Sequence, residues 1–242
     1  MAIVAKNILI VSDNPHLITE FCKIVAHDDY KTCNFKIVCT SDPAKFNGND
    51  VERINIKKDY HKLIGKYDLI LSLHCKQLFP KELVNNIKCI NVHPGLNPYN
   101  RGWFPQAFSI INGLPVGATI HEIDEEIDHG GVIAQKSVQI ESWDTSLTVY
   151  EKVLETEIDL LKKNLLSILS GEYKVLTLKE EGNLNLLADY KKICEFDLDR
   201  KMTLGEAINL MRALTHPPYK NAFFVDNKSK KKVYVSLNIT CE

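Results

Sequence analysis

The most informative part of the sequence is residues 89–139, CINVHPGLNPYNRGWFPQAFSIINGLPVGATIHEIDEEIDHGGVIAQKSVQ. The stretch opens with a short apolar strand that carries Asn91 and His93 and stops at Pro94. Side chains alternate along a strand, so Asn91 and His93 share one face and Val92 takes the other. Polar side chains at a strand's exit, before a loop rich in Pro, Gly and Asn, are typical of an active site in an open α/β sheet. The competing interpretation is that both residues only cap the strand.

Outward from this stretch, short apolar runs alternate with helical patterns. Strands are predicted at residues 7–11, 35–40, 69–73, 87–92, 116–122 and 131–140. Helices are predicted at residues 15–27, around 60–64, at 80–85 and 105–112, and from a cap at Thr145 to Gly171. This alternation predicts an α/β fold with a Rossmann-like, doubly wound, mostly parallel sheet. The first turn reads Ser-Asp-Asn-Pro rather than G-x-G-x-x-G, which excludes a nicotinamide or flavin dinucleotide site there.

The C-terminal quarter has a different composition. Residues 172–192 are charged and read as irregular. A capping box from Thr203 to Glu206 then opens a helix that Pro217 and Pro218 stop, and a β-hairpin is expected over residues 221–225 and 232–237. We therefore expect a domain at residues 1–180 and a small α+β appendage with a β-hairpin at residues 181–242. The open edge of that hairpin suggests a homodimer.

Composition narrows the class of protein. The 242-residue chain is 45% hydrophobic and 25% charged, as in ordinary globular proteins, and its net charge of -1 disfavours a nucleic-acid partner. Seven cysteines without a C-x-x-C pair exclude a disulfide framework and a structural zinc signature, which indicates a reducing, cytoplasmic setting. Residues 1–15 lack the length and flanks of a signal peptide, and the absence of a run of 18 apolar residues predicts no membrane span.

Four segments together carry a resemblance to a known family. They are NVHPGLNPYNRG at residues 91–102, ING at 111–113, TIH at 119–121 and IDHGG at 127–131. This set resembles the formyltransferases that use 10-formyltetrahydrofolate, whose core motif pairs Asn-x-His with a downstream Asp before Gly. The loop NPYNRGWFPQ at 97–106 and the segment ALTHPPYKNA at 213–222 are similar to the branch that N-formylates dTDP-linked amino sugars. Longer family members carry a larger terminal domain, and the one here is expected to be trimmed.

Formyl transfer to an amine requires proton removal from the amine, stabilisation of the carbonyl oxygen and protonation of the leaving folate nitrogen. An imidazole suits the first task, so His93 is the candidate base, and the carboxamide of Asn91 can donate to the oxyanion. The resemblance gives Asp128 the role of orienting His93. For Asp128 the alternative is ordinary turn chemistry. His121 either lines the pocket or is a satisfied core histidine, and His129 is expected to face solvent.

The resemblance also implies binding residues. It places the folate against Leu78, Phe79, Glu122, Ile127 and Asp128. For the nucleotide sugar, Lys76 and Arg101 on loops at the carboxyl end of the sheet are the candidate cations for the phosphates. Trp103, Phe104 and Tyr219 are the stacking candidates, and Asn221 is a further expected contact. The competing interpretation for Lys76 and Arg101 is a solvated loop charge. For Trp103 and Phe104 it is packing between domains. His74 and Cys75 lack a third ligand at metal spacing, so no metal is expected.

These residues predict an enzyme that moves the formyl group of 10-formyltetrahydrofolate, as cosubstrate, onto a dTDP-amino-dideoxyhexose. The favoured acceptor is dTDP-4-amino-4,6-dideoxyglucose, a precursor of surface polysaccharides such as O-antigen. The sequence does not decide whether the acceptor amine is at C4 or at C3. It also does not determine the stereochemistry of the sugar or the residues that contact the thymine. Methionyl-tRNA formyltransferase is disfavoured by the short tail and the net charge. A non-catalytic folate or nucleotide-sugar binder is the alternative from another class.

Overall fold

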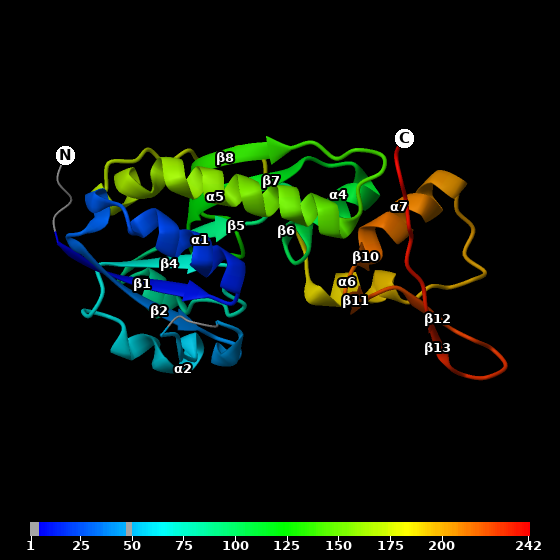
Figure 1. Ribbon diagram of the computed structural model, residues 1–242, viewed down its shortest axis with the longest axis horizontal. Coiled ribbons are helices and arrows are strands. Elements are labelled where there is room, and N and C mark those ends of the chain that lie inside the picture. The colour runs from blue at the N-terminus through cyan, green and yellow to red at the C-terminus, as the bar shows by residue number, and fades with distance from the viewer. Residues whose placement is uncertain (1–4, 47–49) are drawn as a thin grey trace.

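The computed structural model describes residues 5–46 and 50–242. Residues 1–4, the start of the segment assessed above as a leader, lie outside the described residues. A seven-stranded sheet with the order β3-β2-β1-β4-β5-β7-β8 dominates the fold (Figure 1). Its strands are β1 Lys6–Ser12, β2 Cys33–Cys39, β3 Glu52–Arg53, β4 Leu69–Leu73, β5 Lys88–His93, β7 Val116–Glu122 and β8 Val132–Val138. The first five are parallel, and β7 and β8 are antiparallel, so the predicted mostly parallel α/β sheet is confirmed.

The order of the strands fixes where a ligand can bind. The chain runs outward from β1 to β3 and then returns to place β4 on the other side of β1. Such a reversal opens a crevice beyond the carboxyl ends of the strands, and ligands of open α/β sheets bind there. The residues after β1, β4 and β5 all meet at this edge.

Helices cover both faces of the sheet because each buried strand is apolar on both sides. In β1, Ile8 and Ile10 belong to the larger core, whereas Leu9 and Val11 belong to the smaller one. The larger core lies beneath α1 (Pro15–Val25) and the long α5 (Ser146–Ser170), and the smaller one beneath the short α2 (Ile56–Asp59) and α3 (Lys81–Val84). Figure 1 shows these two layers above and below the sheet.

Caps place the helices where the sequence predicts them. The side chain of Asn14 accepts hydrogen bonds from the backbone N–H groups of His16 and Leu17 at the start of α1. Thr145 begins α5 with a capping box, and Gly171 ends it at φ +79°. The expected box from Thr203 to Glu206 opens α7 (Leu204–Leu214).

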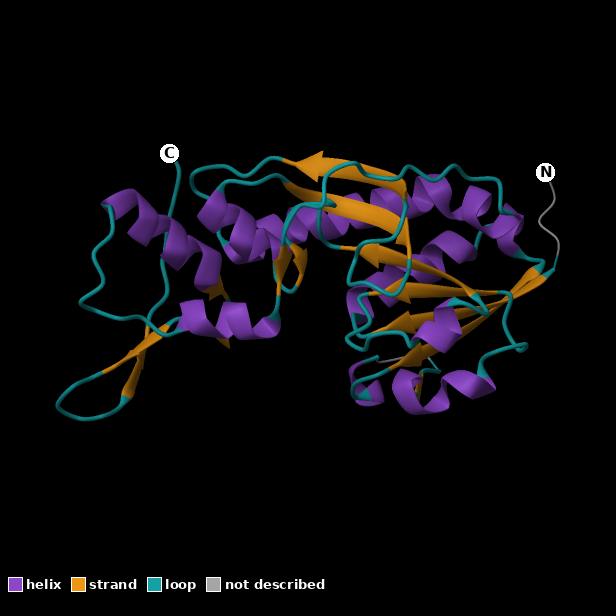
Figure 2. Ribbon diagram, turned by 180° about the vertical axis from the view of Figure 1, so that it is seen from behind, coloured by secondary structure: helices purple, strands orange, loops and turns teal. Residues whose placement is uncertain are grey.

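A second, smaller unit extends from one end of the sheet. It contains α6 (Leu187–Cys194), α7, the strands β10 (Thr215–His216) and β11 (Tyr219–Lys220), and the hairpin of β12 (Phe223–Val225) and β13 (Lys232–Tyr234). Helix α7 packs against α4 (Pro105–Asn112) and α5, and the hairpin projects away from the rest of the chain (Figure 2). The hairpin is thus present with shorter strands than expected, and the domain boundary near residue 180 stays a prediction.

Two expectations about local structure were wrong. The helix expected around residues 60–64 is a single α-turn, α2, followed by a 3₁₀ turn at Tyr60–Lys62, because Gly65 at φ +77° ends the segment. Residues 172–192 are not irregular throughout, since they include β9 (Leu184–Asn185) and most of α6. The partner of β9 is β6 (Arg101–Gly102), which is distant in sequence, so no local pattern predicts the pairing.

Within the described ranges, no helix is both long enough and apolar enough to cross a membrane.

Candidate active site

Asn91, His93 and Asp128 lie together at the carboxyl end of β5. Nδ2 of Asn91 donates to Oδ1 of Asp128 over 3.2 Å, and Nδ1 of His93 lies 3.5 Å from Oδ2 of the same carboxylate. The alternation along β5 brings Asn91 and His93 to one face, and the loop after β7 returns Asp128 to them. The three residues singled out from the sequence therefore form one constellation.

His93 is a buried base with one free nitrogen. Its ring is 3% exposed, and its Nε2 has no hydrogen-bond partner among the described residues. Gly95 makes room for this nitrogen, since a Cβ at residue 95 would lie 2.3 Å from Nε2. Burial lowers the pKa of His93 to about 4, against the opposing pull of Asp128. The imidazole is thus neutral at pH 7 and able to accept a proton at Nε2.

Asp128 occupies a strained position in a turn. Its φ is +49°, a left-handed conformation that an aspartate adopts more readily than most residues do. Burial alone would raise the pKa of this carboxyl, but His93, His121 and the backbone N–H of Gly102 hold the pKa below its ordinary value. Gly102 donates to Oδ2 over 3.1 Å. Asp128 is therefore an ionised carboxylate fixed by four neighbours: Asn91, His93, His121 and Gly102.

His121 belongs to the same constellation, although the sequence left its role open. It is 1% exposed, and its Nδ1 donates to the carbonyl of Glu122 over 2.7 Å. Its Nε2 lies 3.3 Å from Nδ2 of Asn91 and 3.5 Å from Oδ1 of Asp128. A buried histidine on the strand next to His93 was visible in the sequence as Thr-Ile-His. Its position beside both polar partners depends on the antiparallel register of β5 and β7.

A second buried polar network lies next to this constellation and was missed by the sequence analysis. Glu157, in the middle of α5, is fully buried, and both of its oxygens lie within 2.9 Å of Nε2 of His74. The other ring nitrogen of His74 faces the amide of Asn14 and the hydroxyl of Tyr150. His216 lies beside Tyr150, with ring centroids 5.5 Å apart. The apolar periodicity of α5 gave no signal for Glu157, because one carboxylate hardly alters a hydrophobic stripe.

The other residues predicted to contact folate differ in exposure and in the partners that hold them. Leu78 is 56% exposed, and Phe79 packs on the smaller core. The carbonyl of Ile127 accepts from Arg101 over 3.3 Å. The carboxylate of Glu122 accepts hydrogen bonds from Lys88 and Tyr173, and only the backbone of Glu122 approaches the constellation.

Among the residues predicted to contact the nucleotide sugar, some are exposed and others are held by the protein. Lys76 is exposed on the loop after β4, and Tyr219 is 69% exposed. Arg101 is 6% exposed and pairs with Glu181 over 2.6 Å. The remaining three are engaged within the chain: Phe104 stacks on Tyr190 at 3.9 Å, Trp103 lies beside Phe104, and Asn221 donates to the carbonyl of Leu214.

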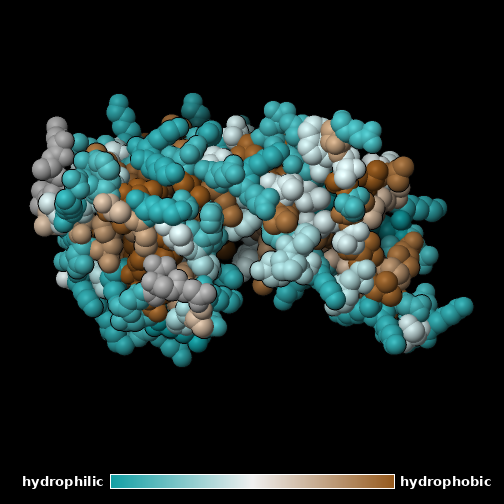
Figure 3. Space-filling model, in the orientation of Figure 1, coloured by the Kyte–Doolittle hydropathy of each residue, from teal (hydrophilic) through white to brown (hydrophobic). Residues whose placement is uncertain are grey.

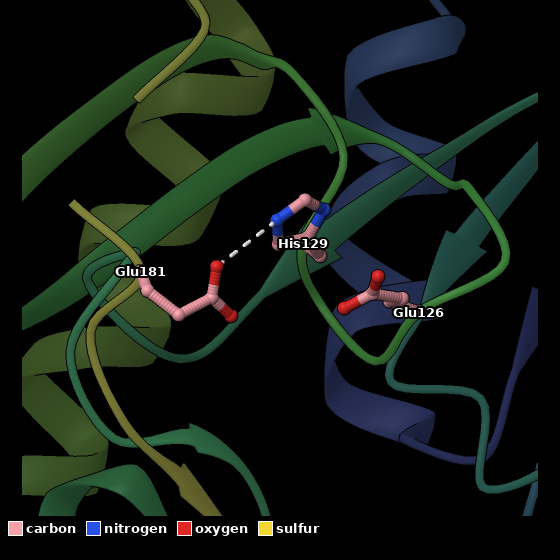
Figure 4. Close-up of side chains that lie close together, drawn as sticks. All are labelled: Glu126, His129 and Glu181. Atoms are coloured by element: carbon pink, nitrogen blue, oxygen red, sulfur yellow. Dashed lines mark ion pairs between the residues drawn. The ribbon is translucent and has the colours of Figure 1, made fainter. Parts of the chain in front are cut away.

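One group in the described part of the chain has the composition of a metal site. The exposed side chains of Glu126, His129 and Glu181 point toward one another (Figure 4), and their possible ligand atoms all lie within 4.8 Å of one another. His129 faces solvent, as expected, and contacts Asp124 and Glu181. Arg101 already neutralises the charge of Glu181. His74 and Cys75 do not belong to this group, and the expectation that no metal is needed stays a prediction.

Two family models match the chain. The model described as formyl transferase matches residues 5–165. The model described as N-formyltransferase dimerization C-terminal domain matches residues 189–241. The first covers the sheet and the constellation around His93, and the second covers most of the smaller unit.

Individual proteins agree with these matches. The dTDP-4-amino-4,6-dideoxyglucose formyltransferase of Mycobacterium tuberculosis is 48% identical over 185 residues, which are 76% of this chain and 79% of that protein. A 4-N formyltransferase from Francisella tularensis has a crystal structure that superposes with a TM-score of 0.93 at 45% identity, covering 98% of this chain and 99% of the other. A sugar N-formyltransferase from Shewanella gives a TM-score of 0.94 at 44% identity, covering 98% of both chains.

Proposed function

The chain belongs to the formyl transferase family, and from this premise we propose that it transfers the formyl group of 10-formyltetrahydrofolate to the amine of dTDP-4-amino-4,6-dideoxyglucose. The observation that carries the proposal is the constellation of Asn91, His93 and Asp128 in a chain 48% identical to an enzyme named for this acceptor. A base, an oxyanion donor and a fixed carboxylate are the groups that formyl transfer needs. In this proposal the product serves the synthesis of a surface polysaccharide.

His93 acts as the base in this proposal. Its Nδ1 faces Asp128 and keeps the hydrogen, so Nε2 accepts the proton from the attacking amine. The imidazolium that forms is stabilised by the carboxylate 3.5 Å away. The proton can then return to the leaving nitrogen of the folate, which completes the exchange of one N–C bond for another.

Asn91 supplies the oxyanion donor. Its amide nitrogen has two hydrogens, which it shares between Asp128 at 3.2 Å and His121 at 3.3 Å. We infer that the hydrogen facing His121 turns to the carbonyl oxygen as negative charge develops there. A neutral amide suits this role because it donates without ionising.

The folate is expected to lie against the two loops that flank Asp128. Leu78 and Phe79 offer an apolar wall, and backbone groups from Glu122 to Asp128 can pair with a flat polar heterocycle. Solved structures that share the fold are titled as complexes with tetrahydrofolate or folinic acid.

The acceptor is expected to occupy the hollow between the sheet and the smaller unit (Figure 3). Lys76, which is exposed on the loop after β4, is the expected cation for the diphosphate, and Tyr219, which is exposed in β11 of the smaller unit, is the expected stacking partner for the base. The aromatic series continues inward from Tyr219 through His216 to Tyr150. Direct roles for Arg101, Trp103, Phe104 and Asn221 stay predictions. Trp103, Phe104 and Asn221 are stacked or bonded within the chain, and we expect these three to support the loops instead.

We also propose that the protein is a homodimer joined through residues 189–241. The matched family model is named for dimerization, and large apolar side chains are exposed in this unit (Figure 3). They include Leu198 at 64%, Leu204 at 76% and Tyr234 at 48% exposure. Large exposed apolar side chains on one unit are often covered by another protein chain.

The test is turnover by the purified full-length chain with 10-formyltetrahydrofolate and dTDP-amino sugars whose amine is at C4 or C3. We expect mass spectrometry to detect one added formyl group on dTDP-4-amino-4,6-dideoxyglucose, and none when both Asn91 and His93 are alanine. Formylation of the C3 isomer alone would overturn the assigned acceptor. No product from any sugar, with folate bound, would overturn the proposed function.

A further inference from the structure

Residues 180–185 lie directly on the loop that follows β5. Strand β9 in this segment pairs in parallel with β6 in the loop. The backbone N–H of Arg101 donates to the carbonyl of Asn183, and that of Trp103 donates to the carbonyl of Asn185, each over 2.9 Å. In return the N–H of Asn183 donates to the carbonyl of Pro98. Residues 183–185 are therefore hydrogen-bonded to the loop at Pro98, Arg101 and Trp103.

Glycine makes this close approach possible. A Cβ on Gly182 would lie 2.0 Å from the carbonyl oxygen of Pro98. A Cβ on Gly102 would lie 2.5 Å from the carbonyl oxygen of Asn185. Real side chains do not approach backbone oxygens this closely, so the two segments are in direct backbone contact.

An asparagine cluster joins the same two segments through side chains. Asn100 is fully buried at φ +49°, and its Oδ1 accepts from the amides of Asn112 (2.8 Å), Asn183 (2.7 Å) and Asn185 (3.1 Å). Its backbone N–H donates to Oδ1 of Asn183 over 2.8 Å, so Asn100 and Asn183 are reciprocally bonded. A buried polar cluster that is this fully bonded defines one loop conformation.

The gripped loop in turn holds the turn at Asp128. Asn97 donates to the carbonyl of Asp128 over 2.8 Å, and Arg101 donates to the carbonyl of Ile127 over 3.3 Å. Gly102 donates from its backbone to the carboxylate of Asp128 over 3.1 Å. Two groups of the loop therefore hold the strained residue Asp128, and a third holds its neighbour Ile127.

We propose that residues 180–185 act as a clamp on this loop and that Asn183 is a positioning residue for Asp128. The clamp holds Asn100, the loop carries Gly102 and Arg101, and these hold Asp128 against His93. The kinetic test of this inference rests on the proposed function, because the position of Asp128 affects the rate only if Asp128 takes part in the proposed reaction. A displacement of about 1 Å at such a group can cost on the order of 100-fold in rate.

The test is Asn183→Ala, with Asn185→Ala as the matched control. Asn183→Ala removes both reciprocal bonds to Asn100, and we expect kcat to fall roughly 10- to 100-fold while KM for either substrate changes less than about threefold. Asn185→Ala removes the longest of three bonds to an oxygen that keeps two others, so kcat should stay within about threefold of wild type. An unchanged kcat in Asn183→Ala would overturn the proposal.

Two further measurements separate positioning from general damage. In an Asp128→Asn background, Asn183→Ala should lower kcat no further, because the residue acts through Asp128. If Asn183→Ala lowered kcat as much in the Asp128→Asn background as in the wild type, Asn183 would not act through Asp128. Amide hydrogen exchange at residues 99–103 should accelerate in Asn183→Ala, with the seven-stranded sheet still protected. Hydrogen exchange is measured without turnover. It therefore tests the clamp even if the proposed acceptor is wrong.

Discussion

His93 is buried, its Nε2 has no hydrogen-bond partner among the described residues, and the proposed reaction depends on that nitrogen. We predict that His93→Ala lowers kcat roughly 100- to 10,000-fold, the usual contribution of a general base. Asn91→Ala should raise the barrier by about 3 to 4 kcal/mol, the usual cost of losing one oxyanion donor. Steady-state kinetics with both substrates would measure these losses.

His129→Ala provides the control for these variants. His129 is also a histidine near Asp128 in sequence, but it is exposed on the loop and contacts Asp124 and Glu181. Its removal should leave kcat within about threefold of wild type, because it lies outside the constellation of buried groups. Near-normal turnover in His93→Ala would contradict the assignment of the base.

Glu157 is a buried carboxyl group whose partner is a single histidine, His74. We predict that Glu157→Leu lowers the free energy of unfolding by about 3 kcal/mol, because His74 loses the carboxylate that pairs with it inside the protein. Glu157→Gln keeps the shape and one acceptor, and should cost about 1 kcal/mol. Urea titration of the two variants would measure the difference. A Leu variant as stable as the Gln variant would show that the pair contributes little.

The packing of the loop after β5 against the ring of His93 depends on one small residue, Gly95. Gly95→Ala would place a methyl group 2.3 Å from Nε2 of His93 and 3.2 Å from Pro105. We predict a fall in kcat of roughly 100-fold, because the ring must rotate away from Asp128 or the loop must shift. Gly113→Ala is the comparison, since its Cβ meets nothing within 4 Å and only the positive φ is strained. Equal kinetics in the two variants would contradict the steric account.

The elements that the sequence predicted well are those that local signals define. Strand β4 and helix α4 match their predicted bounds, because a continuous apolar run and the Asn112-Gly113 stop are local. The three residues of the constellation followed from strand alternation and the family motif. The clamp did not, because β6 pairs with a segment some eighty residues away, where no amphipathic pattern exists. Pairings of two residues between distant loops depend on tertiary geometry alone.

At the scale of the whole molecule, the candidate active site involves residues of both units. In the proposed function the sheet contributes the base, the donor and the carboxylate, and the smaller unit contributes Tyr219 and His216, which lie next to Tyr150. The clamp lies between them and leads within two residues into α6. Because α7 also packs on α4, which follows the gripped loop, the smaller unit supports that loop from two sides. Its position therefore bears on the active site as well as on the proposed dimer.

Protonation of His93 should also be visible in the stability of the whole protein. Burial lowers its pKa from an ordinary value near 6.5 to about 4, so between these values the unfolded chain binds more protons than the folded one. The free energy of unfolding therefore falls as the pH is lowered through this window. Glu157 opposes the trend, because burial raises its pKa and the folded state then binds the extra proton.

A comparison with His93→Gln separates the two effects, since glutamine does not titrate and Glu157 is present in both proteins. We predict that the wild type loses more free energy of unfolding between pH 7 and pH 4 than His93→Gln does, by on the order of 3 kcal/mol. Urea titrations at a series of pH values would measure both curves. Parallel curves would mean that the folded protein protonates His93 as easily as the unfolded chain does, and the imidazole would then be partly charged at the acidic end of the working range and less able to accept the proton of the amine.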